Sequence, residues 1–151
     1  MKKQVGNTAK TVVITGATSG IGLAAARQLA GLGFWVIGAG RDATRCAAAE
    51  AAVRSGAPGA RVDYLVADLS SQRQVRALAV AIRRLLEAED GGRLDVLVNN
   101  AGTVSTWYTA TEDGYETQFA VNHLAPFLLT QELLPLLQKA EGARVLTTSS
   151  G

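Results

Sequence analysis

The chain has little of the chemistry that disulfides, metal centres or membrane spans require. Its 151 residues include one cysteine, Cys46, and one histidine, His123. A single cysteine forms no disulfide within the chain, which fits a reducing cytoplasm, and these two residues are too few for a zinc site. No apolar run reaches the roughly 18 residues that cross a bilayer, and no leader sequence precedes the first apolar run. We therefore expect a cytoplasmic protein with no metal and no membrane span.

The chain also has little net charge and no strongly basic cluster. The formal net charge is +2, only 5% of the residues are aromatic, and the basic residues are scattered. This pattern does not favour nucleic-acid binding. With 48% hydrophobic and 19% charged residues, the composition is that of one globular domain. We expect residues 1–10 to be a polar lead-in and residues 11–151 to form the domain.

A glycine-rich turn, Thr15–Gly22 with the sequence TGATSGIG, is the most informative segment. An apolar run precedes it and a helical-looking run follows, and a strand, tight turn and helix N-terminus together form an anion site. Gly16 would allow the sharp turn, Gly20 would let a pyrophosphate approach, and Gly22 would let helix and strand pack closely. The spacing differs from the commoner Gly-x-Gly-x-x-Gly, so a turn without a ligand stays open on this motif alone.

Short apolar runs alternate with helical segments along the whole chain. The pattern predicts strands at 11–15, 35–38, 64–66, 96–98 and 144–148, with helices near 19–32, 43–55, after Ser70 or Ser71, and over 115–139. This alternation is typical of an α/β, doubly wound parallel sheet (Rossmann-like) in three layers, αβα, with strand order 3-2-1-4-5. Polar or glycine-containing segments follow all five strands, where ligands bind in such sheets.

The motifs resemble those of the short-chain dehydrogenase/reductase family in order and approximate spacing. They are Thr15–Gly22, Asp68-Leu69, Asn99–Gly102, Asn122 and Ser149-Ser150. Thr111–Phe119 and Val121–Leu124 look like the retinol-dehydrogenase-like branch. The resemblance implies an oxidoreductase that moves hydride between a nicotinamide cofactor and a carbonyl or alcohol.

The resemblance also implies which residues hold the cofactor: Gly16, Thr18, Ser19, Gly20, Ile21, Gly22, Asp68, Leu69, Asn99, Ala101 and Gly102. Asp68 would accept from the adenine amino group with Leu69 against the ring, and Gly102 would admit the ribose. Helix capping by Asp68 stays an alternative, and we expect Asn100 to be structural.

Arg41 bears on the choice between NADP(H) and NAD(H). It follows the second strand, where an arginine can pair with a 2′-phosphate and an acid would instead accept from a 2′-hydroxyl. Gly40 stands where NAD-preferring relatives carry an acid, and we expect Asp42 to face solvent or cap the next helix. The sequence favours NADP(H) and leaves NAD(H) open, as well as a solvated turn role for Arg41.

Two residues are candidates for catalysis. Pro126 has no N–H to give to the carbonyl of Asn122, four residues earlier in a predicted helix. In the family the matching asparagine kinks the helix and holds a water in a proton relay, and we expect the free Asn122 carbonyl to do the same. By the family pattern, Ser150 would bond the substrate oxygen.

The chain departs from the family at one point. The family's acid/base pair is Tyr-x-x-x-Lys, whereas Tyr64, Tyr108 and Tyr115 are followed at that spacing by aspartate, glutamate and phenylalanine. We expect an N-terminal portion, truncated after the fifth strand, with an exposed sheet edge and no activity by itself. A non-catalytic dinucleotide-binding module or redox sensor stays open, as does a homo-oligomer. An apolar carbonyl or alcohol is the expected substrate.

Overall fold

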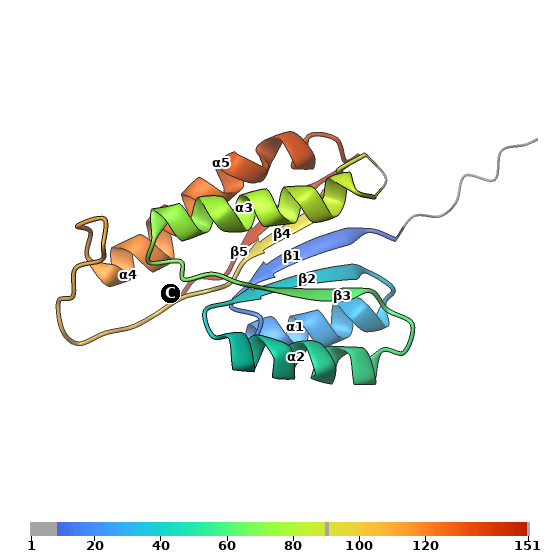
Figure 1. Ribbon diagram of the computed structural model, residues 1–151, viewed down its shortest axis with the longest axis horizontal. Coiled ribbons are helices and arrows are strands. Elements are labelled where there is room, and N and C mark those ends of the chain that lie inside the picture. The colour runs from blue at the N-terminus through green and yellow to red at the C-terminus, as the bar shows by residue number, and fades with distance from the viewer. Residues whose placement is uncertain (1–8, 90, 151) are drawn as a thin grey trace, which may run out of the picture.

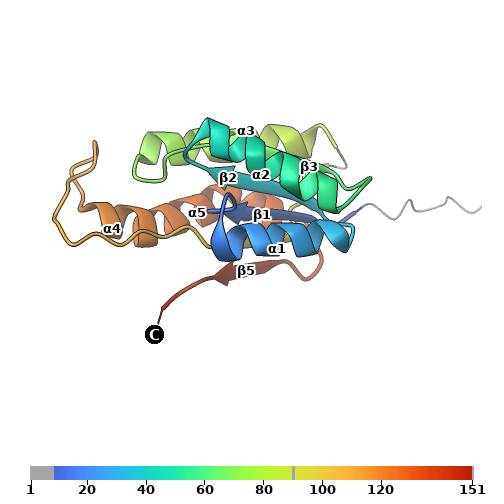
Figure 2. The ribbon, with the colours of Figure 1, turned by 90° about the horizontal axis from the view of Figure 1, so that it is seen from below.

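The computed structural model describes residues 9–89 and 91–150 and contains one parallel five-stranded sheet. The strand order is β3-β2-β1-β4-β5, which confirms the predicted order. Helices α1 and α2 cover one face of the sheet, and α3 and α5 cover the other (Figures 1 and 2). The predicted three-layer α/β architecture is therefore confirmed.

The elements follow the predicted segments with small changes in their bounds. The strands are β1 (Thr11–Thr15), β2 (Trp35–Gly40), β3 (Val62–Val66), β4 (Val96–Asn99) and β5 (Arg144–Thr147). The helices are α1 (Gly20–Gly31), α2 (Ala43–Gly56), α3 (Gln72–Glu87), α4 (Thr117–Phe119), the π-helical turn η1 (Ala120–Leu124) and α5 (Ala125–Leu137). Strand β2 runs two residues beyond its prediction because its Ala39 and Gly40 pair with Leu65 and Val66 of β3.

Strand β1 is the centre of the core, and all five of its residues are buried. Its alternate side chains point to opposite faces of the sheet. Val13 joins the apolar cluster beneath α3 and α5, whereas Val12 and Ile14 join the cluster beneath α1 and α2. Burial on both faces explains why this segment reads as a continuous apolar run.

The helix predicted over 115–139 is present from Thr117 to Leu137, but its bonding is not α-helical throughout. The segment divides into α4, η1 and α5, and in η1 the N–H of Ala125 donates to the carbonyl of Ala120, five residues earlier. Pro126 cannot donate to Asn122, which matches the expected loss of regular α-helical bonding near Asn122.

The two ends of the described chain lie at exposed positions. Residues 1–8 of the expected lead-in are outside the described residues, and Lys10 is exposed. All four residues of the edge strand β5 are exposed, as expected for its free side. No helix within the described ranges is both long enough and apolar enough to cross a bilayer.

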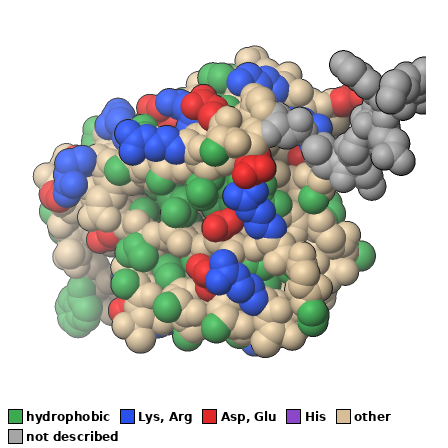
Figure 3. Space-filling model, turned by 45° about the vertical axis from the view of Figure 1, so that its right-hand side comes forward, with side chains coloured by type: hydrophobic (Ala, Val, Ile, Leu, Met, Phe, Trp, Pro, Cys, Tyr) green, Lys and Arg blue, Asp and Glu red, His purple; other side chains and the backbone are tan. Residues whose placement is uncertain are grey.

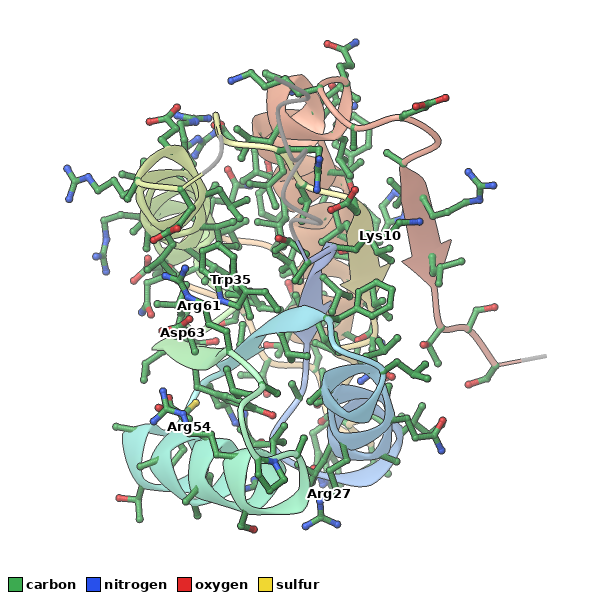
Figure 4. The ribbon with its side chains drawn as sticks, turned by 90° about the vertical axis from the view of Figure 1, so that its right-hand side faces the viewer. Lys10, Arg27, Trp35, Arg54, Arg61 and Asp63 are labelled. Atoms are coloured by element: carbon green, nitrogen blue, oxygen red, sulfur yellow. The ribbon has the colours of Figure 1, made fainter. Side chains whose placement is uncertain are left out.

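A charged cluster closes the end of the sheet where its strands begin. The Arg61 guanidinium stacks 3.6 Å from the centre of the Trp35 ring, and Trp35 Nε1 donates to Asp63 at 2.7 Å. Figure 4 labels these three side chains side by side, and Figure 3 shows acidic and basic groups adjacent on this face. The cluster shields the edge of the core and lies at the opposite end of the strands from the cleft described below.

Candidate functional site

A cleft of about 360 Å³ lies where strands β1 to β4 end. Eight of the predicted site residues line it, namely Gly16, Thr18, Ser19, Arg41, Asp68, Leu69, Ala101 and Gly102. The other lining residues are Ala39, Gly40, Arg45, Ala67, Ser70, Asn100, Thr103, Thr117 and Val121. The structure thus brings four separate strand ends together around one space.

The glycine-rich turn requires its glycines for identifiable reasons. Gly16 has a φ of +64°, and a Cβ there would lie 2.8 Å from the Ala101 Cα. A Cβ on Gly22 would lie 2.2 Å from the Gly16 carbonyl oxygen, so Gly22 lets the helix approach its own turn. Gly20 has a φ of +54° and open space around it, which leaves room for a ligand at the backbone.

The N-terminus of α1 is available to an anion. Ser19 is the N-cap, yet its side chain makes no capping hydrogen bond, and the first turn contains no acidic residue. The first N–H groups of a helix lack partners within the helix and carry partial positive charge. Ile21, in the same turn, is 70% exposed beside this end. A phosphate group would satisfy these donors.

Two arginines without carboxylate partners line the next part of the cleft. Arg41 and Arg45 are both exposed, and neither forms an ion pair with any described residue. The Asp42 side chain accepts from the Arg45 N–H at 2.8 Å and caps α2, as expected. Sequence reasoning missed Arg45, although its place in the first turn after a capping aspartate is a signal that it lies near Arg41.

Asp68 and Leu69 line the cleft beyond β3. One Asp68 carboxylate oxygen accepts from the Ser70 N–H at 2.9 Å, and the Asp68 N–H donates to Gln74. The cap of α3 is Ser71, whose side chain accepts from the Gln74 N–H, so the alternative that Asp68 caps this helix was wrong. A second carboxylate oxygen of Asp68 remains for a ligand's amino group.

Asn99 and Asn100 have different surroundings. Asn99 is buried, and its amide donates to Thr130 of α5, so its side chain lies between β4 and α5 and not in the cleft. Its contact with a cofactor stays a prediction. The Asn100 amide donates to the carbonyls of Thr15 and Gly16, and its oxygen accepts from Thr148. Asn100 therefore ties three strand ends together, which is the structural role expected of it.

The family model for short chain dehydrogenases matches residues 10–151 of the chain. The chain belongs to the short-chain dehydrogenase family. The fold, the glycine-rich turn and the cleft at the strand ends all agree with this assignment.

The relatives of the chain include mouse enzymes named for apolar alcohols. The chain is 45% identical to retinol dehydrogenase 14 of Mus musculus, with 93% of the chain and 44% of the relative covered. It is 40% identical to polyprenol dehydrogenase of Mus musculus, with 93% and 42% covered. The chain therefore spans less than half the length of these curated relatives.

Solved structures of the family superpose well on the chain. A metagenomic short-chain oxidoreductase in complex with NADP has a TM-score of 0.76 at 33% identity, covering 93% of this chain and 62% of that one. L-Sorbose reductase from Gluconobacter frateurii, complexed with NADPH and L-sorbose, has a TM-score of 0.77 at 28% identity, covering 92% and 51%. Both likenesses extend over nearly all of this chain.

Asn122 lies in η1, outside the lining of the cleft. Its side-chain oxygen accepts from the Thr103 N–H and its amide donates to the Thr103 carbonyl, both at 2.8 Å. Thr103 itself lines the cleft. Asn122 thereby fixes the start of the loop that follows Gly102, and the role of its carbonyl in holding a water stays a prediction.

The loop after Thr103 is held at its far end by α3. The Ser71 hydroxyl donates to Glu112, and the Gln72 N–H donates to Asp113 at 2.8 Å. Between these attachments, Val104, Trp107 and Tyr108 are 75–90% exposed. The loop therefore holds exposed apolar side chains on a backbone that is anchored at both ends.

Ser150 lies beyond β5, is exposed, and bonds to no other described residue. The structure therefore leaves its predicted role at the substrate untested. Burial raises the pKa of the Cys46 thiol beneath Gly40, which makes this cysteine a small core residue and not a nucleophile. Among the described residues, no three histidine, cysteine, aspartate or glutamate side chains gather in a metal-binding arrangement.

Proposed function

We propose that the chain carries the cofactor-binding part of an NADP(H)-dependent oxidoreductase that acts on carbonyls or alcohols. The observation that carries this proposal is a cleft at four strand ends, lined by Ser19 at the start of α1 and by two arginines that form no ion pair with a described residue. NADP(H), when bound, would supply or accept a hydride at its nicotinamide ring.

The donor set of the cleft fits such a cofactor. The turn Gly16–Gly22 and the N-terminus of α1 would hold the pyrophosphate, and Asp68 with Leu69 would hold the adenine. Arg41 and Arg45 would hold the 2′-phosphate, because a guanidinium donates two hydrogen bonds to a phosphate. No carboxylate occupies position 40 to repel that phosphate. The complexes of related enzymes with NADP and NADPH support this choice.

Two residues would act on the substrate side. Ser150 would donate a hydrogen bond to the substrate oxygen, and the Asn122 carbonyl would hold a water that passes a proton. The chain has no tyrosine followed by lysine four residues later. We propose that residues 1–151 alone bind NADPH without reducing a carbonyl.

The substrate that we propose is an apolar aldehyde, ketone or alcohol. Its support comes from the names of the retinol and polyprenol dehydrogenases and from the exposed Val104, Trp107 and Tyr108 on the anchored loop. Apolar side chains held in water near a cleft favour an apolar ligand.

The decisive experiment compares the dissociation constants of NADPH and NADH for the purified protein and two variants. Arg41→Ala should weaken NADPH about 10- to 100-fold and leave NADH unchanged, because the lost hydrogen bonds reach only the 2′-phosphate. Arg84→Ala is the matched control, since Arg84 is an exposed arginine on α3 that does not line the cleft. Equal affinity for both nucleotides would refute the choice of NADP(H), and no binding of either would refute the proposed function. Binding without turnover by the protein purified from its source cells would favour the nucleotide-binding module or redox sensor.

A further inference from the structure

A tyrosine outside the cleft holds the glycine-rich turn from behind. The Tyr64 hydroxyl, on β3, donates to the Ala17 carbonyl at 2.8 Å across 47 positions of sequence. Its ring lies over Gly38 of β2, where a Cβ would come within 2.6 Å of the ring atoms. Because Gly38 has no side chain, the Tyr64 side chain can cross β2 and reach the turn after β1.

The Ala17 peptide groups are fixed on both sides. Ala17 is fully buried, and its N–H donates to the Ala39 carbonyl at 3.1 Å. In a planar trans peptide the carbonyl of one residue and the N–H of the next point in opposite directions. Because the Ala17 carbonyl points inward to Tyr64, the N–H of Thr18 points away from Tyr64. Thr18 lines the cleft where the phosphates would lie.

We propose that Tyr64 is a positioning residue for the cofactor, which sets the Ala17–Thr18 peptide so that the turn presents its N–H groups to the pyrophosphate. This inference rests on the proposed function, since it needs a dinucleotide in the cleft. Tyr64 touches no cofactor atom itself and acts only through Ala17.

The hydroxyl is a dependable donor. Burial is the largest cause that raises the pKa of Tyr64 to about 12; the nearby Cys46 and Glu50 also raise it, and Arg27 lowers it. The group therefore keeps its proton throughout the neutral range. The Tyr64 backbone is fixed as well, because its N–H donates to the Glu50 carboxylate at 3.0 Å.

The test uses the purified protein with Tyr64→Phe, which removes the hydroxyl and keeps the ring over Gly38. NADPH and NADH should both bind about 3- to 10-fold more weakly, by the same factor, because the pyrophosphate is common to both. Tyr115→Phe is the matched control, since the Tyr115 hydroxyl bonds to no described residue; its affinities should stay unchanged. Melting temperatures are recorded for each variant, because a merely structural role would lower them without moving the dissociation constants.

A second variant tests the route by which the hydroxyl acts. Gly38→Ala should push the Tyr64 ring aside and weaken both nucleotides, and in the Tyr64→Phe background it should weaken them no further. Unchanged dissociation constants in Tyr64→Phe would overturn the inference, as would a loss confined to NADPH, which would place the effect at the 2′-phosphate. Failure of the unaltered protein to bind either nucleotide would overturn the proposed function, and this inference with it.

Discussion

Gly22→Ala should disable the cleft through one added methyl group. The new Cβ would lie 2.2 Å from the Gly16 carbonyl oxygen and 2.6 Å from the Asn100 amide nitrogen. Ordinary contacts of a Cβ are 3.4–4 Å, so the turn and the helix must separate by about 1 Å. Both groups in the clash belong to the fixed part of the site, because the Asn100 amide donates to the Gly16 carbonyl.

Two magnitudes follow from this clash. Overpacking of this kind costs about 1–3 kcal/mol, which corresponds to a fall in melting temperature of about 2–12 °C for a domain of this size. A displacement of about 1 Å at a binding group can reduce function by about 100-fold, and we expect a similar loss of NADPH affinity.

The assay is NADPH binding by fluorescence titration together with thermal unfolding. Gly31→Ala is the matched control, because Gly31 is at the other end of α1 and a Cβ there meets nothing within 4 Å. This control should bind NADPH normally and gain about 0.5–1 kcal/mol of stability. An affinity of Gly22→Ala within threefold of the unaltered protein would show that the close contact does not shape the binding turn.

Three further predictions concern other parts of the structure. Trp35→Ala should lower the free energy of unfolding, measured with denaturant, by about 3–5 kcal/mol, because it removes the ring beneath Arg61 and the bond to Asp63. The folded variant should keep its NADPH affinity. Asn122→Ala should release Thr103 and increase protease cleavage of the following loop. Cleavage at the rate of the unaltered protein would show that the two bonds from Asn122 to Thr103 do not hold this loop. Hydrogen bonds from the N–H groups of Gln118 and Phe119 lower the pKa of the Glu116 carboxyl below its ordinary 4.5. The ionised carboxylate therefore stabilises the fold above pH 4.5, and this stabilisation is lost as the pH falls. Glu116→Gln should flatten the acid side of a plot of melting temperature against pH.

The sheet could be predicted because each strand is marked by residues that are adjacent in the sequence. Buried strands such as β1 read as continuous apolar runs, and each is followed by glycine or polar residues. The right-handed crossover rule then leaves few strand orders, and the predicted one is confirmed. Eight of the predicted site residues line the cleft because the ends of parallel strands meet at one edge.

The remaining features depend on contacts between distant segments. Nothing near Tyr64 in the sequence indicates that its hydroxyl meets Ala17, since the contact requires β3, β2 and the turn after β1 to be in place. The docking of Glu112 on α3 likewise joins positions 41 residues apart. Pro126 indicates which helical bond is missing, but the sequence does not show that the bond from Ala125 to Ala120 forms a π-helical turn in its place.

The glycine-rich turn is held by residues on or after β2, β3 and β4, and not by β1 alone. Asn100, after β4, holds the carbonyls of Thr15 and Gly16 and also accepts from Thr148 after β5. Tyr64 holds Ala17 from β3 through the gap over Gly38 in β2. Among the described strands β5 pairs with β4 alone, and it is exposed along its length, so the bond from Thr148 is the most accessible of these supports. A partner bound to the free side of β5 would therefore hold Thr148 in place. Through Asn100 it would also hold the turn that is proposed to bind the pyrophosphate.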